Sequence, residues 1–85
     1  MILDIDAGNS FVKWRIKDGS VDIAEGPQVI AEGSEATGQV VKAGLNLGST
    51  QRLTQARIAS VADPAVTETV RDQMQRQFNL ELHIA

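Results

Sequence analysis

The sequence contains no cysteine and no tyrosine, and only one tryptophan and one histidine among its 85 residues. Without cysteine, neither a disulfide scaffold nor a thiolate metal site is available. No run of about 18 apolar residues is present, so no segment is predicted to span a membrane. Residues 1–6 carry two aspartates and no base, which is unlike a secretory signal peptide. These absences together lead us to expect a soluble cytoplasmic protein.

Basic residues are in the minority. Lysine and arginine number 8 against 11 aspartates and glutamates, which gives a net charge of −3. The bases form no dense patch, since those of residues 36–60 are spread between Lys42 and Arg57. A surface that binds the phosphate backbone of nucleic acid needs clustered positive charge. The sequence therefore predicts no nucleic-acid partner, and its length allows one small domain.

The spacing of apolar residues predicts both strands and helices. Residues 11–17 alternate between apolar and charged side chains, which is typical of a half-buried strand. Asp63 followed by Pro64 is a typical helix start. The helix that follows carries one apolar stripe, which consists of Val66, Val70, Met74 and Phe78.

The expected strands cover residues 2–7, 11–17, 21–24, 57–62 and 80–84, and residues 28–31 are expected to resume a strand at a sheet edge. A tight turn is expected at Asp18-Gly19. A first helix is expected from an N-cap at Ser34 to about residues 46–48. The order β-β-β-α-β-α-β predicts an α/β fold with a mixed sheet, in which a hairpin lies on one side and parallel strands on the other. The sequence stops directly after an apolar strand, so we expect residues 1–85 to be a partial domain, cut at its C-terminal end.

Two aspartates lie two positions apart in the first expected strand. Asp4 and Asp6 therefore project from the same face of that strand. Carboxylates on an otherwise apolar strand are costly to bury unless they bind a cation or accept several hydrogen bonds. The pair is therefore a candidate for cation binding.

The turn after this strand combines residues that suit phosphate. Gly8 lacks a side chain, which lets a phosphate approach backbone N–H groups. Asn9 and Ser10 add short hydrogen-bond donors, and Lys13 adds a positive charge. Together with the carboxylate of Asp6, they suit a hairpin that binds Mg²⁺ and nucleotide phosphates. The same residue types are common in ordinary polar turns, so composition alone leaves both interpretations open.

Residues 6–14, with the pattern Asp-x-Gly-Asn-Ser-x-x-Lys-Trp, resemble the first phosphate motif of type III pantothenate kinases. Residues 58–61, Ile-Ala-Ser-Val, followed by Pro64, resemble the strand-to-helix junction of the same family. That family belongs to the superfamily of acetate and sugar kinases, heat-shock chaperones and actin. The resemblance therefore implies an RNase H-like mixed sheet and the incomplete first half of an actin-like ATPase domain.

The resemblance implies an enzyme that phosphorylates pantothenate with ATP, in the first step of coenzyme A biosynthesis. By position, the residues that would bind ATP and its phosphates are Asp6, Gly8, Asn9, Ser10 and Lys13. Asp6 would also help to hold Mg²⁺, whereas Asp4 matches no fixed position of the family pattern and stays unassigned. A monovalent cation and a homodimeric full-length protein are implied in the same way.

The general base of the family is an aspartate in a later Gly-x-Asp-Arg motif. The sequence contains no Asp-Arg pair, and Arg71-Asp72 is the reverse order. The resemblance therefore implies that no catalytic residue lies in this chain, that the base and the pantothenate site come from later sequence, and that the 85 residues alone are inactive.

Two other functions stay open. One is a non-catalytic accessory or regulatory factor of the same family, which acts by binding a partner. The other is an RNase H-like metal-dependent nuclease, in which Asp4 and Asp6 would ligate the metal. The acidic net charge and the spacing of Asn9, Ser10 and Lys13 argue against the nuclease.

Overall fold

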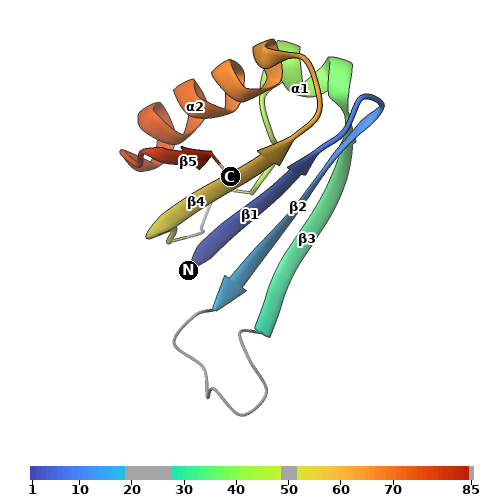
Figure 1. Cartoon of the computed structure of the whole chain (residues 1–85). Helices are drawn as coiled ribbons and strands as arrows, with labels where there is room; N and C mark the ends of the chain where they lie inside the picture. The colour runs from blue at the N-terminus through green and yellow to red at the C-terminus, as the bar shows by residue number, and fades with distance from the viewer. Residues whose placement is uncertain (19–27, 49–51, 85) are drawn as a thin grey trace.

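The computed structural model describes residues 1–18, 28–48 and 52–84, which form one mixed sheet and two helices (Figure 1). In chain order the elements are β1 (Ile2–Ala7), β2 (Phe11–Asp18), β3 (Gln28–Ala36), α1 (Thr37–Ala43), β4 (Gln55–Ser60), α2 (Pro64–Phe78) and β5 (Leu82–Ile84). The predicted α/β class and the predicted order of elements are confirmed. The expected strand at residues 21–24 and the glycine of the expected turn at residues 18–19 lie outside the described residues.

The strands are arranged in the order β3-β2-β1-β4-β5, with β1 at the centre. β1 pairs antiparallel with β2 and parallel with β4, while β2 pairs antiparallel with β3 and β4 pairs parallel with β5. This is the predicted mixed sheet, with antiparallel strands on one side and parallel strands on the other. Because β1, β3 and β4 run in the same direction, their carboxyl ends meet at one edge of the sheet.

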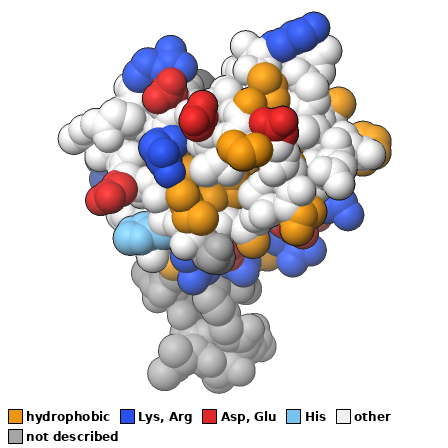
Figure 2. All heavy atoms as spheres, turned by 45° about the horizontal axis from the view of Figure 1, so that its top comes forward, with side chains coloured by type: hydrophobic (Ala, Val, Ile, Leu, Met, Phe, Trp, Pro, Cys, Tyr) orange, Lys and Arg blue, Asp and Glu red, His pale blue; other side chains and the backbone are white. Residues whose placement is uncertain are grey.

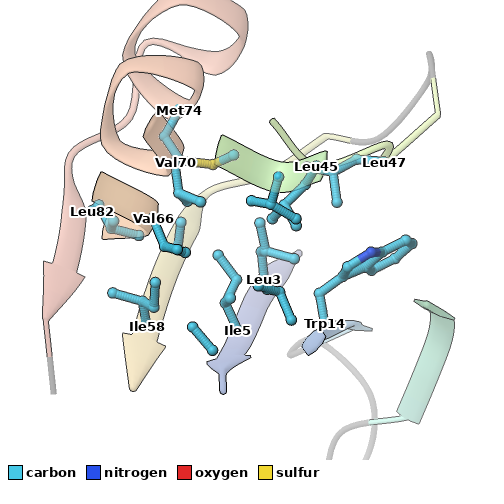
Figure 3. Packing of buried hydrophobic residues seen from close by; sticks show 14 of the residues in the cluster. Leu3, Ile5, Trp14, Leu45, Leu47, Ile58, Val66, Val70, Met74 and Leu82 are labelled. Carbon is cyan, nitrogen blue, oxygen red and sulfur yellow. The ribbon is translucent and has the colours of Figure 1, made fainter. Parts of the chain in front are cut away.

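Both helices pack on the same face of the sheet (Figure 1). Side chains of β1 alternate between the two faces, so Leu3 and Ile5 enter the core while Asp6 is exposed on the opposite face. Figure 3 shows Leu3, Ile5 and Ile58 of the sheet on the side where Val66, Val70 and Met74 of α2 lie. The opposite face, here called the open face, carries no helix among the described residues.

Helix α2 begins and ends as its sequence predicts. The side chain of Asp63 accepts a hydrogen bond from the N–H of Ala65 at 2.9 Å, and Pro64 is the first helical residue. The helix ends where Asn79 adopts a left-handed conformation with φ 53°, and its N–H donates to the carbonyl of Gln75. The predicted stripe is confirmed, since its first three members are fully buried and Phe78 packs against the core.

The predicted start of the first helix is wrong. Ser34 belongs to β3, where it pairs with Lys13 of β2. The N-cap lies two residues later, at Ala36, and has no side-chain cap, so Thr37 is the first helical residue. Hydrogen bonding to β2 continues to the end of β3 and outweighs the local capping preference of serine. The helix also ends earlier than predicted, at Ala43, because Gly44 turns the chain with a φ of 76°. Strand β4 begins and ends two residues earlier than predicted, and β5 begins two residues later.

No helix in the described part of the chain is long and apolar enough to cross a membrane.

The side chain of Gln73 anchors the segment after α1 to helix α2. Its Oε1 accepts a hydrogen bond from the Leu45 N–H at 2.7 Å, and its Nε2 donates to the Leu45 carbonyl at 2.6 Å. Both residues are buried, with 7% and 4% of their surfaces exposed. A Cβ at Gly44 would lie 2.6 Å from the Gln73 Oε1, so this close approach also requires glycine. Gln73 therefore satisfies two backbone groups that water does not reach.

We expect Gln73→Leu to lower the free energy of unfolding by about 2 kcal/mol or more, because both backbone groups of Leu45 would stay buried without a partner. The matched control is Gln75→Leu on the same helix, where the glutamine is exposed. That variant should change the free energy of unfolding by less than about 0.5 kcal/mol. Chemical denaturation followed by circular dichroism measures both, and equal effects would contradict the anchoring role.

Candidate functional site

The turn between β1 and β2 lies at the edge of the sheet where β1, β3 and β4 end (Figure 1). The Gly8 N–H donates to the Phe11 carbonyl at 2.9 Å and closes the turn. Asn9 and Ser10 are exposed at its tip. Among residues 1–18, 28–48 and 52–84, none accepts a hydrogen bond from the N–H groups of Asn9 and Ser10. The turn therefore presents two adjacent backbone donors to solvent.

The structure changes what Gly8 contributes. Its own N–H is occupied within the turn, so it offers no donor to a phosphate. Its lack of a side chain still matters, because a Cβ would lie 3.1 Å from the Phe11 carbonyl oxygen. Gly8 thus permits the tight closure that leaves the next two N–H groups free.

Asp6 and Lys13 face each other across the two strands that lead into and out of the turn. They are register partners in the antiparallel β1–β2 ladder, and both are exposed. In the described part of the chain, the Asp6 carboxylate makes no hydrogen bond and no ion pair. The predicted residues Asp6, Gly8, Asn9, Ser10 and Lys13 are therefore brought together at one end of the β1–β2 hairpin. The carboxylate of Asp6 and the ammonium group of Lys13, neither paired with a described residue, lie beside the two unbonded N–H groups of the turn.

Asp4 has a different environment from Asp6, although both lie on the open face. Its Oδ1 accepts from Arg57 Nε at 2.8 Å, and its Oδ2 accepts from Arg57 Nη2 at 3.1 Å. Lys17 Nζ lies 2.8 Å from the same Oδ2. Asp4 of β1 therefore ties together β2 and β4, the strands on either side of it.

The two bases determine the protonation of Asp4. Partial burial by itself would raise the pKa of Asp4, but the hydrogen bonds and positive charges of Lys17 and Arg57 outweigh it. The pKa of Asp4 is therefore lowered from its ordinary value of 3.8. The carboxylate is therefore charged, and its charge is balanced by Lys17 and Arg57 of the neighbouring strands. Asp4 is thus a structural residue, and Asp6 is the acid of this strand that is free to bind a ligand.

The junction between β4 and α2 lies beside the turn. Ala7 and Ser60 are register partners at the ends of the parallel strands β1 and β4, and the Val61 N–H donates to the Ala7 carbonyl at 3.0 Å. The two segments that carried the sequence resemblance are therefore neighbours in space. Val61 is 80% exposed at this junction and Phe11 is 57% exposed beside the turn. In Figure 2, which turns the top of Figure 1 toward the viewer, hydrophobic side chains gather between acidic and basic ones.

The open face below the turn contains a shallow depression of about 440 Å³. Its lining includes Asp4, Asp6, Lys13, Lys17 and Arg57. Since Asp4 is already paired with two of these bases, the groups of this lining that are free for a ligand lie toward the turn, at Asp6 and Lys13.

The residues at the turn fit a divalent cation that arrives together with phosphate. Across the described ranges, no three acidic or histidine side chains come together as a complete metal cage. Mg²⁺ is commonly held by one or two carboxylates together with substrate phosphates and water. The unpaired carboxylate of Asp6, beside N–H groups that can bind phosphate oxygens, fits this kind of Mg²⁺ binding.

Thr37, the first residue of α1, was missed by the sequence analysis. Its N–H donates to the Ser10 carbonyl at 3.0 Å, and its Oγ1 donates to the Gly8 carbonyl at 2.8 Å. No local signal in the sequence pointed to it, because the helix start was predicted at Ser34. Its importance depends on the pairing of β3 with β2, which brings residue 37 to the turn.

Comparison with known proteins assigns the chain to a family. The family model for type III pantothenate kinase matches residues 2–85. The chain belongs to the type III pantothenate kinase family. Curated type III pantothenate kinases from two strains of Pseudomonas putida are each 28% identical to it over 85 residues, which is 100% of this chain and 32% of each relative. The chain therefore spans about a third of the length of these relatives.

Two solved structures of the Aquifex aeolicus Ppx/GppA phosphatase family are similar in fold. Each is 16% identical and aligns over 99% of this chain with a TM-score of 0.49, covering 35% and 34% of the respective solved chain. The family assignment rests on the family model and not on these structures. It confirms the resemblance that was recognised from residues 6–14 and 58–61.

The ion pairs of Asp4 predict a pH dependence of stability in this pantothenate kinase family member. Since the pKa of Asp4 is lowered in the folded state, its stabilising effect is present above pH 3.8 and is lost as the pH falls through the lowered value. We expect Asp4→Asn to reduce the free energy of unfolding at neutral pH by about 1 kcal/mol. The difference from wild type should shrink as the pH falls below 3.8, when Asp4 becomes protonated.

The matched control is Asp72→Asn on the exposed face of α2, where the carboxylate forms no ion pair with any described residue. Urea denaturation of the three proteins at several pH values provides the measurement. A constant difference between wild type and Asp4→Asn across this range would contradict the assignment of Asp4 as a paired carboxylate.

Proposed function

We propose that this chain supplies the ATP-phosphate-binding part of a pantothenate kinase, which phosphorylates pantothenate with ATP in the first step of coenzyme A biosynthesis. The observation that carries the proposal is the free carboxylate of Asp6 opposite Lys13, beside a turn with two free N–H groups. Membership of the type III pantothenate kinase family supports the substrate assignment.

The proposed roles follow from the chemistry of phosphoryl transfer, which depends mainly on positioning and on electrostatic stabilisation. The N–H groups of Asn9 and Ser10 bind phosphate oxygens, and Lys13 balances their negative charge. Asp6 holds the divalent cation, for which we propose Mg²⁺. When bound, the cation neutralises charge on the phosphates. Gly8 takes part by closing the turn and not by donating its own N–H group.

The remaining parts of the reaction are assigned to sequence outside residues 1–85. We propose that these residues form the first part of an actin-like ATPase domain, and that the general base and the pantothenate pocket belong to the rest of it. A requirement for a monovalent cation and a homodimeric full-length protein are further parts of this proposal. The coverage of a third of the length of the curated relatives is in keeping with it.

The two rival functions differ in how the structure bears on them. A metal-dependent nuclease of the kind considered above would use Asp4 and Asp6 as joint metal ligands. Both oxygens of Asp4 are occupied by Lys17 and Arg57, which disfavours that use. An accessory factor that acts only by binding a partner gains no support from the free donors and the free carboxylate at the turn.

We expect Asp6→Asn to reduce ATP-dependent phosphorylation of pantothenate by about 100-fold or more in the full-length protein that contains this chain. The substitution removes the charge that holds the cation but keeps the size of the side chain. The matched control is Asp4→Asn, the same substitution two residues away on the same face, which should retain turnover close to wild type. Phosphopantothenate formation from ATP provides the assay.

Two results would contradict the proposal. Wild-type protein that does not phosphorylate pantothenate would exclude the kinase activity and favour the accessory role. An Asp6→Asn variant as active as Asp4→Asn would exclude Asp6 as the cation ligand.

A further inference from the structure

Among the described residues, Thr37 is the residue from outside residues 8–11 that bonds to the tip of the turn. Thr37 bonds to two carbonyls of the turn, through its N–H to that of Ser10 at 3.0 Å and through its Oγ1 to that of Gly8 at 2.8 Å. The third closing contact is internal, between the Gly8 N–H and the Phe11 carbonyl. Of the described contacts that fix the turn, only those of Thr37 come from another part of the fold.

The hydroxyl of Thr37 controls the direction of one free donor. The Gly8 carbonyl and the Asn9 N–H belong to the same peptide unit, which is planar and trans, so the two groups point in opposite directions. A Gly8 carbonyl directed at Thr37 therefore requires an Asn9 N–H directed away from it, where no described residue accepts the hydrogen bond. Because one flanking residue is glycine, rotation of this peptide unit has a low steric barrier when the hydrogen bond is absent.

We propose that Thr37 is a positioning residue for nucleotide phosphate, which fixes the Gly8–Asn9 peptide so that the Asn9 N–H faces the ligand. This inference rests on the proposed function. Thr37 itself does not touch the phosphate, and its effect passes through the peptide that it holds. The arrangement resembles other preorganised donor sites, in which the donor is aimed before the ligand binds.

The test compares three substitutions in the full-length protein. Thr37→Val keeps the branched shape and removes the hydroxyl, whereas Thr37→Ser keeps the hydroxyl. Thr69→Val is the matched control, because the Thr69 Oγ1 likewise donates to a backbone carbonyl, that of Val41 at 3.4 Å, but on the helices and away from the turn. A substitution that acts only through stability would affect thermal unfolding and not the readouts below.

The first readout is the amide resonance of Asn9 and its hydrogen exchange in the protein without nucleotide. Thr37→Val should shift this resonance, while Thr37→Ser and Thr69→Val should leave it near its wild-type position. The second readout is steady-state kinetics. Thr37→Val should raise the KM for ATP by roughly fivefold to tenfold, the range expected for one hydrogen bond, with the KM for pantothenate unchanged and with recovery in Thr37→Ser.

An unchanged Asn9 amide in Thr37→Val would overturn the inference, whatever the activity of the protein. If the wild-type enzyme is active, a KM for ATP in Thr37→Val equal to that of wild type would overturn the inference as well. A wild-type protein without kinase activity would overturn the proposed function. In that case the amide resonance alone supports or overturns the control of the Gly8–Asn9 peptide by Thr37.

Discussion

The pairing of β1 with β2 on one side and with β4 on the other is the constraint on which the rest of this structure depends. It fixes which face each β1 side chain occupies, because neighbouring residues of a strand point to opposite faces. Leu3 and Ile5 are thereby directed into the core under α2, and Asp4 and Asp6 onto the open face. A shift of one residue in this register would exchange the two sets and place both carboxylates under the helices.

The same pairing separates the two aspartates into different roles. Asp4 lies between Lys17 of β2 and Arg57 of β4, and its charge is used to link three strands. Asp6 lies two residues nearer the carboxyl end of β1, where its partner on β4 is the uncharged Ala59. Its partner on β2 is Lys13, and the described residues form no ion pair between the two. The carboxylate of Asp6 therefore stays free beside the turn. Chemically identical residues two positions apart thus become a structural ion pair and a candidate cation ligand.

Much of the fold and part of the site could be predicted from the sequence. Features that depend on residues close together in the sequence were predicted, and features that depend on pairing between distant segments were not. Helix α2 was predicted correctly because its signals are local: Asp63 caps the helix, Pro64 opens it, and the apolar stripe has helical spacing. The phosphate motif was recognised because its residues lie within eight positions of one another. The start of α1 was predicted incorrectly because the β2–β3 ladder, which is not local, extends past Ser34.

The contacts that the sequence did not reveal join distant segments. The bond between Arg57 and Asp4 spans 53 positions and depends on the parallel register of β1 and β4. The bonds from Thr37 to the turn depend in turn on where β3 ends. No short pattern predicts a register, so the structural role of Asp4 and the position of Thr37 follow only from the three-dimensional structure.

The central claim is that the β1–β2 turn and Asp6 bind the phosphates and the cation of ATP. A crystal structure of the full-length protein with Mg²⁺ and a non-hydrolysable ATP analogue tests it most directly. The account predicts that the Asn9 and Ser10 N–H groups lie within hydrogen-bonding distance of phosphate oxygens, and that Asp6 lies at the cation. Phosphates bound away from this turn, or a cation held by Asp4 in place of Asp6, would contradict it.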